Sequence, residues 1–115
     1  MDVRTAADLQ RRYQRAGAGA ASRAVRDCDE ALIAARLPEL VGLAVDVYMA
    51  VSADAYQEAT DAMALVNRAV GVAMARAFAS QDDIDWAVVR AAEREAERCQ
   101  RAWKSAYDRL MAAQS

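Results

Sequence analysis

Two short runs of carboxylates come closest to a metal site in this 115-residue sequence. Each run places three acids within four residues: Asp27, Asp29 and Glu30 in the first, and Asp82, Asp83 and Asp85 in the second. Carboxylate oxygens are the ligands that Ca²⁺ and Mg²⁺ prefer. Neither run has the spacing of a calcium-binding loop, and both suit a solvated helix face or the positive N-terminal end of a helix. The sequence therefore predicts no metal ion and no cofactor.

Catalytic side chains are scarce. The sequence has no histidine, which excludes a histidine general base, a Ser-His-Asp triad and histidine-ligated zinc or di-iron sites. The glycine-containing segment 17–20 lacks the lysine and the serine or threonine of a phosphate-binding loop. Glu93 and Glu97 share one side of a predicted helix, but the surrounding arginines favour ion pairs over an acid/base pair. The ion pairs expected along this helix are Arg90 with Glu93, Glu97 with Arg101 and Lys104 with Asp108. We therefore expect a protein that is not an enzyme.

Two cysteines, Cys28 and Cys99, lie about seventy residues apart and form neither a CxxC pair nor a metal-binding cluster. Buried free cysteine behaves as a small apolar residue. A disulfide requires an oxidising compartment, and the first residues show no basic cap followed by the apolar stretch of a secretion signal. We expect both thiols to be reduced and packed, in a cytoplasmic protein.

Arginine is concentrated at the start of the chain. Residues 1–26 carry six arginines and two aspartates, net +4, whereas residues 27–61 carry eight acids and one arginine, net −7. The basic start is expected either to dock on the acidic middle of this chain or of a sister chain, or to contact an acidic partner or phosphates. The whole-chain net charge of −2 and pI near 5.1 disfavour nucleic acid. The candidate interaction residues here are Arg11, Arg12, Tyr13 and Arg15.

Both tryptophans are candidate interface residues, because tryptophan is enriched among side chains that dominate binding energy. The alternative is ordinary core filling. Trp86 lies in the first turn of the last predicted helix, where it would cover one end of a bundle. Trp103 and Leu110 follow Cys99 along the apolar seam of the same helix, at steps of three and four residues. If the end of this helix projects, the recess for Trp103 belongs to another chain.

The elements that position these residues are predicted to be helices. Thirty residues are alanine, the strongest helix former, 56% of the chain is apolar, and almost no segment alternates as a strand does. Capping boxes predict helix starts at Thr5, with Asp8, and at Ser80, with Asp83, and Pro38 separates the second helix from the third. The expected helices run over about 6–16, 20–37, 38–51, 53–79 and 82–113. We predict a single all-α domain, a small antiparallel bundle of four to five helices with a long C-terminal helix.

The predicted helix at 38–51 is apolar around most of its circumference. Glu39, Gly42 and Asp46 form its one narrow polar strip. A helix of this kind either lies at the centre of a bundle or faces a partner. The apolar segment 37–53 that contains it is too short and too charged to cross a bilayer, so we expect no membrane.

The function predicted from these observations is that of a non-catalytic protein–protein interaction module. It would act as a small adaptor, inhibitor or assembly subunit and would self-associate, as a homodimer or higher oligomer. The alternative is a nucleic-acid-binding accessory protein that uses the basic N-terminal helix. The excess of arginine over lysine, fourteen to one, points to GC-rich codons and hence to a bacterium or phage.

Overall fold

The computed structural model describes all residues, 1–115, and contains five α-helices and no strand. The helices are α1 (Val3–Arg15), α2 (Arg23–Arg36), α3 (Glu39–Ser52), α4 (Tyr56–Ser80) and α5 (Asp83–Ala113). The prediction of a small all-α bundle with a long C-terminal helix is confirmed.

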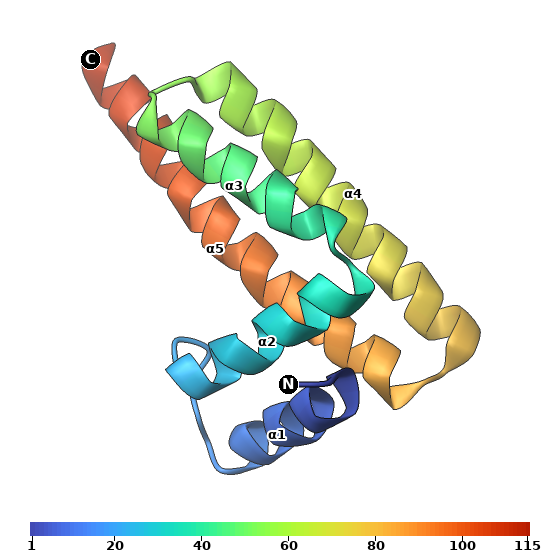
Figure 1. Cartoon of the computed structure of the whole chain (residues 1–115). Coiled ribbons are helices and arrows are strands. Elements are labelled where there is room, and N and C mark those ends of the chain that lie inside the picture. The colour runs from blue at the N-terminus through green and yellow to red at the C-terminus, as the bar shows by residue number, and fades with distance from the viewer.

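Helix α5 runs the length of the molecule, and the other helices pack against it. Its 31 residues extend for about 46 Å at 1.5 Å per residue, close to the 48 Å long axis of the molecule. α3, α4 and α5 lie side by side along this axis, while α1 and α2 pack against the N-terminal half of α5 (Figure 1). α5 is the one helix that contacts all four others, and α1 contacts only α2 and α5.

The starts of α1 and α5 differ from the predicted capping boxes. Instead of Thr5, Asp2 caps α1, and its Oδ1 accepts a hydrogen bond of 2.8 Å from the main-chain N–H of Thr5. Instead of Ser80, Asp82 caps α5, and its Oδ1 accepts from the main-chain N–H two residues ahead at 2.7 Å. The Ser80 hydroxyl donates to Asp85 at 2.6 Å. In both places the N-cap is a neighbouring aspartate, because aspartate caps a helix as well as serine or threonine does.

The other boundaries lie within three residues of those predicted. The shifts of three residues are at the starts of α2, which begins at Arg23 rather than near residue 20, and of α4, which begins at Tyr56 rather than near residue 53. Gly17 adopts a left-handed φ of +80°, which interrupts the helical backbone between α1 and α2. The predicted break at the glycines therefore occurs, and it is followed by a short non-helical segment.

Alanine supplies much of the core. Of the 26 buried residues, 12 are alanine, and nine of these lie on α4 and α5. The largest fully buried apolar side chains come from α2, α3 and α4 and from the connection between α2 and α3: Val25, Leu32, Leu37, Leu40, Val47 and Val66. Small side chains let helix axes approach closely, so the interior is closed by many small contacts.

α4 is long and apolar enough to cross a membrane by length and composition alone, with a mean hydropathy of 1.3 over its best window. This is weak evidence, because the core helix of a soluble protein passes the same test. Seven residues of α4 are buried against the other helices of the bundle.

Candidate functional site

The N-terminal arginines do not converge on one site. Arg11 lies between two carboxylates, 3.6 Å from Asp8 and 3.9 Å from Asp83 at the start of α5. Arg12 and Arg15 are exposed and have no ion-pair partner, whereas Tyr13 is half-buried and packs against the core. The contact of the basic helix with Asp83 is within the chain, but outside the acidic segment 27–61 in which it was expected.

Trp103 finds its recess inside its own chain. Its indole N–H donates to the Thr60 hydroxyl of α4 at 2.9 Å, and its ring lies 5.8 Å from each of the Tyr56 and Tyr107 rings. The end of α5 does extend past the α3–α4 connection (Figure 1), but the expectation that Trp103 would then need another chain is wrong. Leu110, beyond this aromatic cluster, is 37% exposed.

Trp86 lies at the end of the bundle where α4 leads into α5. It is half-buried, and its ring packs edge-to-face against Phe78 with 4.9 Å between centroids. Phe78 itself is 64% exposed. Trp86 therefore covers this end of the bundle, as its place in the sequence suggested.

A buried polar network that the sequence did not reveal joins three helices. Asp29, which was expected on a solvated face, is fully buried and accepts two hydrogen bonds from Arg94, at 2.7 and 2.8 Å. The Gln10 amide donates to Asp29 at 2.8 Å and to the Ala87 carbonyl at 3.2 Å, and it accepts from Arg90 at 3.2 Å. The hydrogen bonds that Arg94 donates to Asp29 raise the pKa of Arg94, whereas burial lowers the pKa of Arg90. The network fixes α1 and α2 on α5.

The spacing of Asp29 was the signal that could have placed it. It stands four residues from Val25 and four from Ile33, both of which are buried on the same stripe of α2. A carboxylate at such a position needs a charged partner, because an unpaired buried charge is strongly unfavourable. Which arginine supplies that partner depends on the packing of α5 and is not visible in the sequence.

The three aspartates of the second acidic run make separate contacts. Asp82 caps α5, Asp83 lies near Arg11, and Asp85 accepts from Ser80 and lies 3.9 Å from Arg36. No group of three acidic or cysteine side chains is close enough to hold a metal ion.

The ion pairs predicted along α5 form only in part. Lys104 and Asp108 pair at 2.9 Å as expected. The expected pairs of Arg90 with Glu93 and of Glu97 with Arg101 are absent. Arg90 instead turns toward Gln10 of α1, since tertiary contacts are available on that side of the helix.

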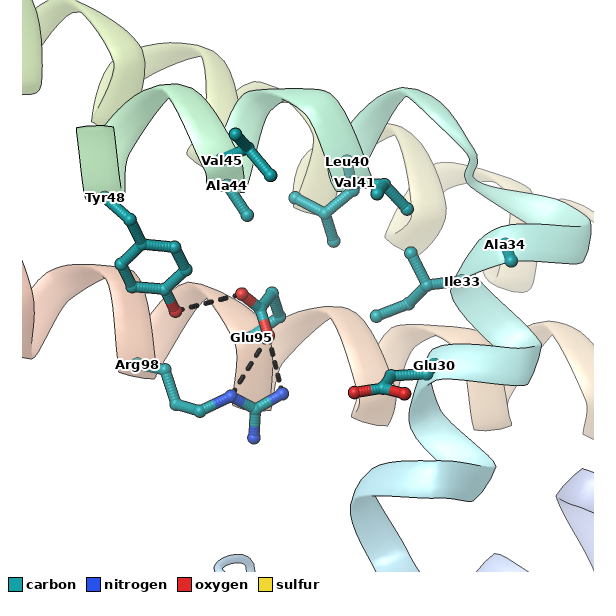
Figure 2. A pocket seen from close by; sticks show the side chains of 10 residues that line it. All are labelled: Glu30, Ile33, Ala34, Leu40, Val41, Ala44, Val45, Tyr48, Glu95 and Arg98. Atoms are coloured by element: carbon teal, nitrogen blue, oxygen red, sulfur yellow. Dashed lines mark hydrogen bonds and ion pairs between the residues drawn. The ribbon is translucent and has the colours of Figure 1, made fainter. Parts of the chain in front are cut away.

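A second polar cluster surrounds Glu95 of α5 (Figure 2). One carboxylate oxygen accepts from the Tyr48 hydroxyl at 3.0 Å, and the other accepts two hydrogen bonds from Arg98, at 3.0 and 2.6 Å. The Cys99 thiol lies 3.8 Å from the first oxygen. Burial raises the pKa of the Tyr48 hydroxyl, and it raises the pKa of Cys99 to about 11. Neither group is available as a nucleophile near neutral pH.

Both cysteines are free and buried, and we expect Cys99 to react slowly with thiol reagents in the folded protein. At pH 8 a thiol with a pKa of 9.0 is about one-tenth thiolate, whereas one with a pKa of about 11 is about one-thousandth thiolate. Native Cys99 should therefore react at least about 100-fold more slowly than in the unfolded chain. A disulfide-exchange dye can measure this in a Cys28→Ala variant, with and without guanidinium chloride.

The raised pKa of Cys99 also makes the stability of the folded protein depend on pH. Because the folded state favours the neutral thiol, this contribution to stability is fully present below about pH 9 and is lost as the pH rises through about 11. Rapid, complete labelling of the native protein at pH 8 would contradict the buried, protonated thiol.

A groove of about 350 Å³ opens beside this cluster, between α2, α3 and α5 (Figure 2). Its apolar lining includes Ile33 and Leu40, which are buried, and Val41 and Val45, which are 50% and 47% exposed. The polar residues that line it are Glu30, Glu95, Arg98 and, by its hydroxyl, Tyr48.

The outer face of α3 continues from this groove. Val41, Val45 and Met49 are spaced four residues apart and so share one side of the helix, and Met49 is 67% exposed. α3 is therefore not central: Leu40, Ala44 and Val47 face the core, while an apolar stripe faces solvent. We refer to Val41, Val45, Met49 and the groove together as the α3 face.

No known protein family, curated protein sequence or solved structure matches this chain. The geometry of its own surface is what supports a function. The α3 face combines exposed apolar side chains with a concave, mostly apolar groove, which is the combination typical of binding sites.

Proposed function

We propose that this chain is a non-catalytic protein-binding module and that the α3 face is its binding surface. The observation that carries the proposal is the exposure of Val41, Val45 and Met49, at 50%, 47% and 67%, on one stripe beside an apolar groove. Contiguous apolar surface on a folded protein marks sites of contact with other molecules. The occupant is either a second copy of the chain or a different protein.

The state of the reactive side chains supports a binding role. Cys28 and Cys99 are buried, and burial raises the pKa of both thiols. Glu95, one of the two carboxylates that line the groove, accepts hydrogen bonds from Tyr48 and Arg98 on both of its oxygens. These groups are engaged in holding the helices together.

A nucleic-acid-binding role through α1 is the second candidate. The exposed and unpaired side chains of Arg12 and Arg15 favour it. Against it, Arg11 is already held between Asp8 and Asp83, and the net charge of −2 gives no long-range attraction to phosphates. Salt-sensitive binding of DNA or RNA that is lost in Arg12→Ala/Arg15→Ala would support this candidate.

Photo-crosslinking tests the α3 face directly. A benzophenone amino acid replaces Val45 in one variant and Leu65 of α4 in the other, since these positions are equally exposed, at 47% and 45%. In an extract of the encoding organism, we expect a discrete covalent adduct from position 45 and none from position 65. Light scattering of the purified chain tells whether that partner is a second copy. Equal adducts from both positions, or none from either, would contradict the proposal.

A further inference from the structure

We propose that the groove between α2, α3 and α5 binds a basic amphipathic helix of another protein. This inference rests on the proposed function, because it names the partner of the same α3 face. The partner would insert two apolar side chains, one helical turn apart, and carry arginine or lysine beside them.

The shape of the groove sets the form of the partner. Its α3 wall runs from Leu40 to Tyr48, about 12 Å or two helical turns. Three helices bound it, and the chain contains no strand whose edge could take up an extended peptide. A helix that lays apolar side chains into a groove is the remaining common mode of peptide recognition.

The charge around the groove indicates that the partner is positively charged. Glu30 lines the groove. Glu39 and Asp46 lie on α3 beyond its exposed apolar stripe, on the side away from the groove. None of these three carboxylates has an ion-pair partner. α3 contains no basic residue, and the one arginine in the groove, Arg98, donates two hydrogen bonds to Glu95.

Arg26, the nearest cation on α2 without an ion-pair partner, does not reverse the negative charge of the groove. Arg26 precedes Glu30 by one helical turn and does not line the groove. The groove is therefore an apolar slot with one unpaired carboxylate, Glu30, in its lining, and two more unpaired carboxylates lie beyond the exposed stripe of α3. This arrangement is complementary to a basic amphipathic helix.

A second copy of the chain fits less well. α1 carries free arginines, but its apolar residues Leu9 and Tyr13 already pack against the core. Pairing of α3 with α3 of a second copy about Val45 would bring the two Asp46 carboxylates together, and like charges at an interface are repulsive.

The end of α5 offers exposed Leu110 and Met111 as another possible occupant. Its nearby cations are already engaged, since Lys104 pairs with Asp108 and Arg109 pairs with Asp54. None of α1, α3 and the end of α5 combines free apolar anchors with free positive charge. α4 carries exposed Leu65 and Val72 near the unpaired Arg68, so docking of α4 of a second copy is the competing arrangement that the solution mass tests.

The test uses designed peptides of helical sequence with a fluorescent label. One peptide carries leucines on a single stripe with flanking arginines, a second has glutamate in place of each arginine, and a third has serine in place of each leucine. Fluorescence anisotropy with the full chain should show the basic peptide binding at least about tenfold more tightly than either control.

Variants of the chain locate the site. Val45→Asp should weaken binding of the basic peptide at least about tenfold, whereas the equally exposed Leu65→Asp on α4 should leave it unchanged. Glu30→Gln should weaken binding and reduce its dependence on salt, because it removes an unpaired charge without changing shape. Circular dichroism and urea unfolding confirm that each variant is folded.

Three results would overturn the inference, and the first two of them leave the proposed function standing. If the chain is a dimer that Val45→Asp dissociates, the occupant is a second copy, and the binding role of the α3 face stands. If the acidic peptide binds as tightly as the basic one, the charge argument fails. Both proposals fail if three observations occur together: no peptide binds, the chain is monomeric, and position 45 gives no specific crosslink.

Discussion

Asp29→Ala is expected to lower the free energy of unfolding by about 3–5 kcal/mol, the cost typical of removing one partner from a buried ion pair. The Asp29 side chain is fully buried and accepts three hydrogen bonds, two from Arg94 and one from Gln10. Without it, the Arg94 guanidinium, only 14% exposed, has no counter-charge. Urea unfolding followed by circular dichroism measures the loss.

Two further variants separate charge from shape. Asp29→Asn keeps an acceptor for Arg94 and should fall between the wild type and alanine. A double-mutant cycle with Arg94→Ala gives the coupling energy, since the double variant leaves no orphaned charge at this site. A loss of less than about 1 kcal/mol for Asp29→Ala would show that the network does not hold α1 and α2 on α5.

Trp103→Ala is expected to reduce the free energy of unfolding by about 2–4 kcal/mol and to leave the molecular mass in solution unchanged. Aromatic-to-alanine changes in a core cost about 3–5 kcal/mol, and Trp103 is only partly buried. The variant removes contacts with Tyr56 and Tyr107 and the hydrogen bond to Thr60. Unfolding and light scattering on the same sample separate stability from association.

Trp103→Phe is the matched control. It keeps an aromatic ring but loses the indole N–H, so we expect a loss of about 1 kcal/mol from the missing hydrogen bond. An alanine variant that kept its stability but changed its oligomeric mass would restore the view that Trp103 serves another chain.

The elements of the fold could be predicted because their causes are local. Alanine content, the helical spacing of apolar residues and Pro38 are all readable along the chain, and they placed five helices within three residues of their bounds. The unusual apolar circumference of α3 also indicated that this helix either lies centrally or faces a partner. The structure shows that part of this circumference is exposed.

The candidate site could not be predicted because three separate helices form it. Ile33, Val45 and Arg98 lie up to 65 residues apart in sequence and meet only when α2 and α3 pack on α5. The same holds for Gln10 and Arg94, whose partner Asp29 appeared to belong to a solvated acidic run. Arg12 and Trp103, which sequence reasoning favoured, lie in neither the groove nor the stripe on α3.

The alanine-rich interior of the bundle lowers the entropic cost of folding. Alanine has no side-chain rotamers to lose, so the 12 buried alanines are ordered at no cost in side-chain conformational entropy. The same close spacing leaves no room for growth, because a larger residue at Ala59 or Ala91, both fully buried, would force the helix axes apart. Sequence change in such a protein is confined to its outside, and a binding surface on α3 can diverge while the scaffold beneath it stays fixed.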